Sequence, residues 1–312
     1  MRDHQLLLNQ KVIQAIEEAI ADLAPALVSA GSGNCGFASN RRYPRGIGPY
    51  DHSVPVLRVT TPDGSRIRGM VYGYACHNTV LGMYTWNGDY AGYASSWLED
   101  RFPGAVAVFH AGCGADQNPL PRRTVELCEQ YGHRLATGVE EALKEQLKPV
   151  TPGLKTAFSY VDLPYLNVVS RRELEADLKS SNGIKARWAA RLLKKLDAGE
   201  TFESAYPYPV HAWQLGKEML VIGQGAESVV DYALKFKTEY GDGTWVMGYA
   251  DDMISYIPSR RVWLEGGYEG GSNLYEYGRP AYRWSGEVED LITETVDQLV
   301  QQVRRKEPSP RE

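Results

Sequence analysis

Cysteine is scarce in this sequence. The 312 residues include four cysteines, which are Cys35, Cys76, Cys113 and Cys128. They form no CxxC pair and are too sparse for a disulfide framework, so we expect reduced, partly buried thiols. No apolar stretch reaches the roughly 20 residues that cross a bilayer, and the first residues lack the apolar core of a signal peptide. The chain as given therefore predicts a cytoplasmic protein with no transmembrane segment.

Basic clusters and the common catalytic signatures are missing as well. The formal charge of −5 is spread along the chain, so nucleic acid is not an expected partner. The sequence contains no HExxH helix, no GxSxG elbow and no P-loop lysine. These absences argue against a helix-borne zinc protease, a serine hydrolase of the elbow type and a P-loop nucleotide binder.

What is present is a succession of strand and helix patterns. A β-hairpin is expected over 55–75, where two alternating runs flank the turn Pro62-Asp63-Gly64-Ser65. Further strands are expected at 105–109, 153–165, 208–216 and 218–223, and helices at 5–23, 124–147, 228–240 and 285–306. With 43% apolar residues available for a core, this order predicts an α/β fold in which a mixed β-sheet is flanked by helices. We expect residues 1–312 to form a single domain, and we expect the amphipathic helix at 5–23 to be packed against another surface.

Residues 170–199 have a different, strongly charged composition. Two amphipathic helices, broken at Ser181-Asn182-Gly183, are expected there. We interpret the segment as a helical insertion over one face of the sheet, either a lid or a solvated excursion.

Polar side chains follow several expected strands, at the positions where an open α/β sheet places its chemistry. The candidates are His77, His110, Asp116, Glu227 and Tyr256. Histidine together with glutamate is typical of catalytic zinc, which uses about three nitrogen or oxygen ligands and leaves a position for water. The alternative to a ligand role, for each of these residues, is a structural role as a hydrogen-bonded residue of the core.

The glycine-rich loop Gly112-Cys113-Gly114 has competing interpretations of its own. Its backbone N–H groups would suit an oxyanion or a phosphate. Asp116 and Asn118, which follow the loop, are alternatively turn-forming residues. Earlier in the chain, Asp89 is placed to cap a helix that begins after it.

Several short motifs recur in one order along the chain. They are Asn40-Arg41, CHNT at 76–79, NGDYAGYAS at 87–95, GADQNP at 114–119, GAE at 225–227, and YIPS at 256–259 followed by GGYEG at 266–270. Together they resemble the catalytic domain of the neutral/alkaline non-lysosomal ceramidase family, over essentially the whole chain.

The resemblance implies a zinc-dependent amide hydrolase. In that family a metal-bound water attacks the amide of an N-acyl sphingoid base, and two histidines, a glutamate and a tyrosine hold the zinc. By position, His77, Glu227 and Tyr256 correspond to three of these ligands. Tyr268 corresponds to the tyrosine that stabilises the oxyanion, and Arg41 to an arginine of the active site.

Three departures from the family pattern bear on the activity. The segment with the family's first zinc histidine is not found in the chain, so we expect an N-terminally truncated catalytic domain, and the family's C-terminal immunoglobulin-like domain is not found either. Asn118 stands where ceramide-cleaving members carry a serine.

The leading hypothesis is zinc-dependent hydrolysis of ceramide or a related N-acyl lipid, and the alternative is a non-catalytic homologue that serves as a binding module. The resemblance also implies secretion or membrane association, in contrast to the cytoplasmic location that the chain as given predicts.

Overall fold

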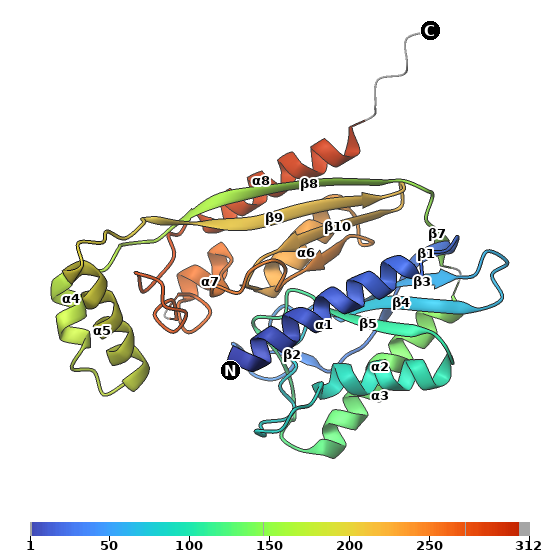
Figure 1. The fold of residues 1–312 in the computed structure, drawn as a ribbon, viewed down its shortest axis with the longest axis horizontal. Helices are drawn as coiled ribbons and strands as arrows, with labels where there is room; N and C mark the ends of the chain where they lie inside the picture. The colour runs from blue at the N-terminus through green and yellow to red at the C-terminus, as the bar shows by residue number, and fades with distance from the viewer. Residues whose placement is uncertain (1, 146, 272, 306–312) are drawn as a thin grey trace, which may run out of the picture.

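The computed structural model describes residues 2–145, 147–271 and 273–305. Within these ranges the chain builds two large β-sheets with helices packed on them (Figure 1). Both sheets are mixed, which confirms the predicted α/β class. The sequence predicts one sheet, whereas the structure divides the strands between two.

The first sheet has the strand order β5-β4-β3-β1-β7. Its strands are β1 (Leu27–Asn34), β3 (Ser53–Thr60), β4 (Ile67–Tyr74), β5 (Val106–Ala111) and β7 (Lys148–Pro149). β4 and β5 run parallel, whereas the other neighbours are antiparallel. The hairpin predicted over 55–75 is the β3–β4 pair, and Gly64 in its turn has a φ of +71°, which glycine adopts without steric cost.

The second sheet has the strand order β12-β10-β9-β8. Its strands are β8 (Leu154–Pro164), β9 (Ala205–Leu215), β10 (Met219–Gln224) and β12 (Trp245–Met247). β8 and β9 form a long antiparallel pair with β8 at the edge, and β10 runs parallel to β12. The strands predicted at 153–165, 208–216 and 218–223 are thereby confirmed.

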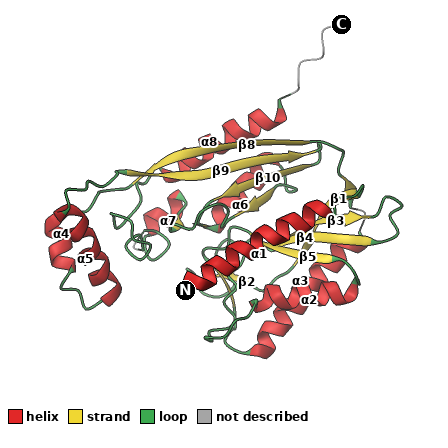
Figure 2. Ribbon diagram, viewed as in Figure 1, coloured by secondary structure: helices red, strands yellow, loops and turns green. Residues whose placement is uncertain are grey.

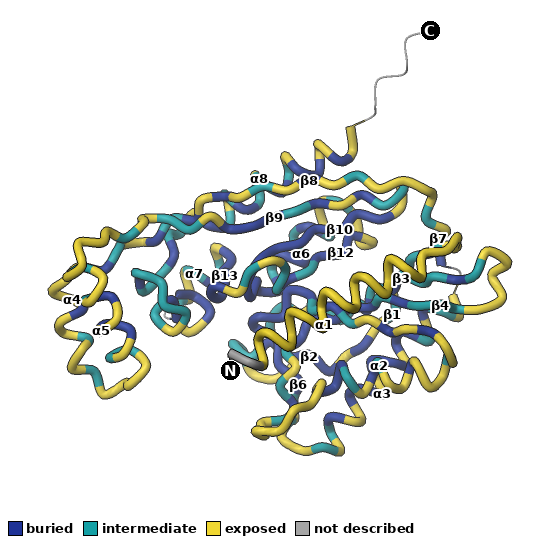
Figure 3. Tube along the Cα trace, viewed as in Figure 1, coloured by how far each residue is buried: buried dark blue, intermediate teal, exposed yellow. Residues whose placement is uncertain are grey.

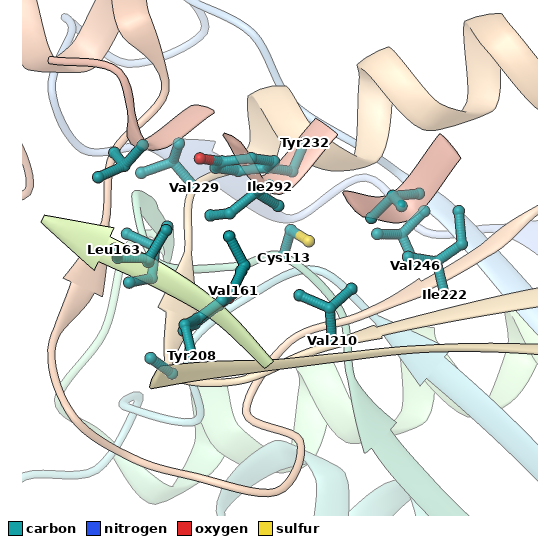
Figure 4. Close-up of a cluster of buried hydrophobic side chains, with 14 of the residues drawn as sticks. Cys113, Val161, Leu163, Tyr208, Val210, Ile222, Val229, Tyr232, Val246 and Ile292 are labelled. Carbon is teal, nitrogen blue, oxygen red and sulfur yellow. The ribbon is translucent and has the colours of Figure 1, made fainter. Parts of the chain in front are cut away.

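Helices cover one face of each sheet (Figure 2). α2 (Asp89–Arg101) and α3 (Val125–Lys144) pack on the first sheet, and α6 (Val230–Tyr240) and α8 (Val288–Arg304) pack on the second. Leu98 and Leu135, on α2 and α3, are fully buried against the first sheet. Figure 4 shows the core of the second sheet, with Ile222 of β10 beside Val246.

Alternation along β10 shows how the two sheets face each other. Leu220 and Ile222 belong to the core beneath α6 and α8, whereas Met219 and Val221 join a small cluster with Leu57 and Val71 of the first sheet. Successive side chains of a strand point to opposite faces, so β10 contacts helices on one side and the first sheet on the other. The order of layers is therefore helices, first sheet, second sheet, helices.

The N-terminal helix α1 (Arg2–Ala21) differs from the expectation. The helix itself is confirmed, but residues 4–21 are exposed throughout (Figure 3), including apolar side chains such as Ile16 at 54%. A ring contact between His4 and Trp86 and an ion pair between Arg68 and Asp22 connect this end of the chain to the rest. The described chain therefore offers no surface that buries residues 4–21 of α1, because other helices already cover the outer faces of both sheets.

The charged segment forms two helices, α4 (Arg171–Asp177) and α5 (Gly183–Asp197), as predicted. Their apolar faces bury Leu174 and Trp188 against the loop that contains Tyr275 and Tyr282. The Trp188 indole N–H also donates to the Arg279 carbonyl at 2.8 Å. This helical pair therefore packs on the chain segment that carries Tyr277.

Among the described residues, no helix combines the length and apolar character needed to cross a membrane.

Candidate functional site

Two short ladders bring distant parts of the chain together between the large sheets. β2 (Ala38–Asn40) pairs antiparallel with β6 (Gln117–Pro119), and β11 (Glu227–Ser228) pairs parallel with β13 (Tyr256–Ile257). In the second ladder Glu227 is the direct partner of Tyr256. Directly paired residues project to the same face of a sheet, so this ladder sets the carboxylate beside the phenol ring.

The turn after β4 carries His77 into the same region. The His77 backbone N–H donates to the Gln117 carbonyl at 3.0 Å, which fixes the turn to β6. The Asp89 carboxylate accepts the Val80 and Leu81 N–H groups that follow. Asp89 was expected to cap a helix beginning after it. The structure places Asp89 at the start of α2 with Gly88 at the cap position, and the carboxylate accepts the Tyr90 N–H of the helix as well as the two N–H groups after His77.

Glycines in the loop 112–114 allow this close packing. A side chain on Gly114 would meet the Cys76 backbone nitrogen at 2.7 Å. The Gly112 N–H already donates to the Tyr74 carbonyl, and the Ala115 N–H to the Ser228 carbonyl. These contacts pack the loop closely against the turn that carries His77, and this close packing requires glycine at position 114.

His77 and Glu227 meet at the centre of the site. The shortest distance from an imidazole nitrogen to the carboxylate is 3.8 Å, between His77 Nε2 and Glu227 Oε2. Burial first, and the Arg41 charge second, lower the pKa of His77 to about 4, so the ring is neutral near pH 7. Within the described chain, Nε2 is buried and has no hydrogen-bond partner.

Two tyrosines that the sequence analysis did not select complete the surroundings of the carboxylate. The Tyr277 hydroxyl donates to Glu227 Oε1 at 2.7 Å. The Tyr249 hydroxyl lies 3.1 Å from His77 Nδ1 and 3.4 Å from Glu227 Oε2. Tyrosines are numerous in this chain, 20 in all, so their positions in the sequence did not single out these two.

Arg41 enters the site directly after β2. Its guanidinium carbon lies 5.4 Å from the centre of the Tyr256 ring and 5.7 Å from that of Tyr268. Its Nε donates to Glu269 Oε1 at 2.5 Å, and Arg42 binds the other oxygen of Glu269 at 2.6 Å. Burial alone would raise the pKa of Glu269, but the two arginines hold it below its ordinary value. The buried carboxylate therefore stays charged and positions Arg41.

Tyr256 and Tyr268 contact each other, with ring centres 5.0 Å apart. Burial and the Glu227 charge raise the pKa of Tyr256, although Arg41 acts in the opposite direction. Tyr256 is therefore a neutral phenol near pH 7. The Tyr268 hydroxyl donates to Glu276 at 2.9 Å, and the residue is 41% exposed, so its ring lies beside Tyr256 while its hydroxyl is bound to Glu276.

Asn118 faces Ser39 across the β2–β6 ladder. Both side chains are buried, and neither Asn118 Oδ1 nor Ser39 Oγ has a hydrogen-bond partner in the part of the chain that the structure describes. Asp116, by contrast, is fully engaged: its carboxylate accepts hydrogen bonds from Asn40, Gln117 and the Val230 N–H. Asp116 thus has a structural role: its carboxylate connects the end of β2 and the start of α6 to β6.

His110 lies outside the site. It sits on β5 and stacks on Trp245 of β12, with ring centres 5.2 Å apart, in the interface between the two large sheets. Burial lowers its pKa to about 4. Like the other candidates, His110 stands near the end of a strand, but it is a core residue.

The site contains few of the side chains that most often bind metals. The described residues include no group of three or more His, Cys, Asp and Glu that would hold an ion. Among the described residues, His77 and Glu227 are a pair, and further oxygen donors that contact them include the hydroxyl groups of Tyr249 and Tyr277. The four cysteines are buried thiols, and burial raises the pKa of Cys76 and Cys113, so neither is set up as a thiolate ligand.

Comparison with known proteins gives a structural match only. No family model matches the sequence, and no curated protein matches it. The neutral ceramidase from Pseudomonas aeruginosa is 20% identical, with a TM-score of 0.67 over 96% of this chain and 56% of its own. A ceramidase solved in complex with C2 is 18% identical, with a TM-score of 0.67 over 95% of this chain and 57% of its own.

The chain thus spans a little over half the length of these ceramidases. At this level of identity the likeness is one of fold, and it agrees with the resemblance that the motifs indicate. Over nearly its whole length the protein has the α/β fold of the neutral ceramidases.

Proposed function

We propose that this protein is a zinc-dependent hydrolase that cleaves the amide bond of ceramide or a related N-acyl lipid. The observation that carries the proposal is the convergence of His77 Nε2 and Glu227 Oε2, 3.8 Å apart, with Tyr256 beside the carboxylate. Two zinc ligands at bond lengths of about 2.1 Å in a tetrahedral arrangement lie roughly 3.4 Å apart. The observed spacing therefore suits one ion.

The chemistry of the donor set also fits zinc. A neutral imidazole with a buried nitrogen, free of hydrogen bonds within the described ranges, is the form of histidine that binds a metal. The carboxylate of Glu227 and the phenol of Tyr256 add two oxygen donors, and the phenol would release its proton on binding. Three nitrogen and oxygen ligands are the number found in catalytic zinc sites, which leave one position open.

In this proposal His77, Glu227 and Tyr256 hold the ion. When bound, zinc would supply a water of lowered pKa and a Lewis acid for the amide carbonyl. Arg41, fixed by Glu269, provides a permanent positive charge against the two tyrosine rings, where it favours negative charge on the amide oxygen.

The remaining side chains bind the substrate. Tyr268 donates its hydroxyl to the amide oxygen after leaving Glu276, and Asn118 forms a hydrogen bond to the substrate amide. A cavity of about 500 Å³, lined by Tyr277, Tyr206 and Arg279 among others, adjoins Glu227 through Tyr277 and offers room for part of the substrate.

Metal content tests this proposal directly. The purified chain should contain about one zinc per molecule, and His77→Ala should lose both the zinc and the hydrolysis of an N-acyl sphingosine panel. His133→Ala, at an exposed position on α3, is the matched control and should retain both. Hydrolysis that persists in His77→Ala, or in the presence of a chelator that removes the zinc, would overturn the proposal.

A second candidate is a homologue without catalysis that binds N-acyl lipids. It is favoured by the absence, among the described residues, of a third His, Cys, Asp or Glu beside His77 and Glu227. It predicts that the protein binds the lipid without turnover and without zinc. The same metal and turnover measurements therefore separate the two candidates.

A further inference from the structure

Tyr249 is held against the residue that precedes Glu227. Its backbone N–H donates to the Ala226 carbonyl at 2.8 Å, and it follows β12 in a left-handed conformation with a φ of +59°. This conformation is uncommon for a residue with a side chain and persists where the surroundings determine it. The backbone of Tyr249 is thus tied to the start of β11, the strand that presents the Glu227 carboxylate.

The hydroxyl of Tyr249 lies within hydrogen-bond distance of both proposed ligands, His77 and Glu227, and its single proton can be donated to only one of them at a time. Glu227 Oε2 is an acceptor only, at 3.4 Å, whereas His77 Nδ1, at 3.1 Å, can donate or accept. In one arrangement the Tyr249 hydroxyl donates to Glu227, and the 3.1 Å contact with His77 is then a hydrogen bond only if Nδ1 carries the proton of the neutral ring. In the other arrangement the hydroxyl donates to Nδ1 and the ring proton is on Nε2. That Nε2–H would face Glu227 Oε2 at 3.8 Å, beyond hydrogen-bond distance.

We propose that Tyr249 is a positioning residue that holds His77 in the Nδ1–H tautomer and thereby turns the lone pair of Nε2 toward Glu227 Oε2. One relay, from Nδ1–H to the phenol oxygen and from the phenol hydroxyl to the carboxylate, orients both groups. The buried Nε2, which has no partner within the described residues, is the nitrogen that this relay leaves available. Metal-binding histidines commonly donate their second ring N–H in this way.

The zinc part of this inference rests on the proposed function, whereas the tautomer is a property of the metal-free protein. Loss of a group that orients a ligand typically lowers metal affinity by about 10- to 100-fold. We expect a loss in this range when the Tyr249 hydroxyl is removed.

Two variants that each delete one hydroxyl provide the test. Tyr249→Phe removes a contact with both His77 and Glu227, and Tyr277→Phe removes a contact with Glu227 alone. Nitrogen-15 NMR of the metal-free wild type should show His77 as the Nδ1–H tautomer. Tyr249→Phe should convert a large fraction of His77 to the Nε2–H form, and Tyr277→Phe should leave the tautomer unchanged.

Zinc titration is the second measurement. Tyr249→Phe should weaken zinc binding by about 10- to 100-fold, and Tyr277→Phe by clearly less, with unchanged thermal unfolding of the metal-free proteins as the check on folding. An Nε2–H tautomer in the wild type, or an unchanged tautomer in Tyr249→Phe, would overturn the inference, as would equal zinc affinities of the two variants. A wild type that binds no zinc but shows the Nδ1–H tautomer would defeat the proposed function and leave the tautomer assignment standing.

Discussion

Arg41 and Glu269 are 228 positions apart in the chain and form a 2.5 Å ion pair beside Tyr256. The Glu269 side chain is 5% exposed and also binds Arg42. Its negative charge therefore compensates the positive charges of two guanidinium groups at a largely buried position. Removing one member of such a network leaves charge without compensation.

We predict that Glu269→Gln lowers the free energy of unfolding by about 2–3 kcal/mol, because the pair with Arg41 is lost from a buried position. Glu265→Gln is the control, since Glu265 binds Arg42 with 35% of its side chain exposed and should change stability by less than about 1 kcal/mol. Urea unfolding at neutral pH measures both. Equal losses would mean that burial does not determine the strength of these pairs.

His110 should make the protein sensitive to acid. Because its folded pKa of about 4 lies below the ordinary value of about 6.5, the unfolded state binds a proton more readily. Stability is therefore fully present above about pH 6.5 and falls as the pH drops toward 4, by about 3 kcal/mol from this residue. His110→Phe should retain the stacking on Trp245 and remove this part of the pH dependence, whereas substitution of the exposed His133 should not. Unfolding curves between pH 7.5 and 4.5 test it, and parallel profiles for wild type and His110→Phe would contradict it.

The exposed apolar face of α1 should contribute little to stability. Ile16→Ala, at a side chain with 54% exposure, should change the free energy of unfolding by less than about 1 kcal/mol. Leu135→Ala, at a fully buried position of α3, should cost about 2–5 kcal/mol. Denaturant unfolding compares the two. A large loss in Ile16→Ala would show that α1 is covered in solution.

Tyr268→Phe should retain zinc and lower kcat by about 100-fold or more, the size expected for the loss of one oxyanion donor. Glu276→Gln removes the acceptor that the Tyr268 hydroxyl now contacts and should have a much smaller effect. Steady-state kinetics with metal content measured in parallel test this. Equal effects of both substitutions would indicate that Tyr268 acts only as part of the loop.

Asn118 should influence which amide is cleaved. Asn118→Ser introduces the residue that ceramide-cleaving members of the family carry at this position, so we expect kcat/KM for ceramide to rise relative to other N-acyl amides. Asn118→Ala should lower turnover of all of them, because it removes a hydrogen-bonding side chain from a buried place. A substrate panel with constant headgroup and varied amide measures the ratio, and an unchanged ratio in Asn118→Ser would argue against a role in specificity.

Much of the secondary structure was predictable because it depends on local patterns. The hairpin at 55–75, the edge strand β8 and the two helices of the charged segment all follow from apolar periodicity and turn residues. The division into two sheets was not predictable in this way. Met219 and Leu220 are both apolar neighbours in β10, and their sequence does not say which faces a helix and which faces the other sheet.

The same distinction holds for the site. His77 and Glu227 were identified from their places at strand ends, and the structure brings them together as that argument requires. His110 met the same criterion and lies in the interface between the sheets. A position at the end of a strand therefore identifies a site residue only when it is also known whether the side chain lies at the site or in the interface between the sheets.

The amino-acid sequence by itself determined the long helices, the long strands and the motifs that resemble the ceramidases, because each depends on residues near one another in the chain. Tertiary structure alone decided that Tyr249 and Tyr277 surround Glu227, that Arg41 pairs with Glu269, and that α1 stands exposed. These contacts arise from the packing of two sheets and two short ladders. Their partners are too far apart in the sequence for any local pattern to specify which side chains meet.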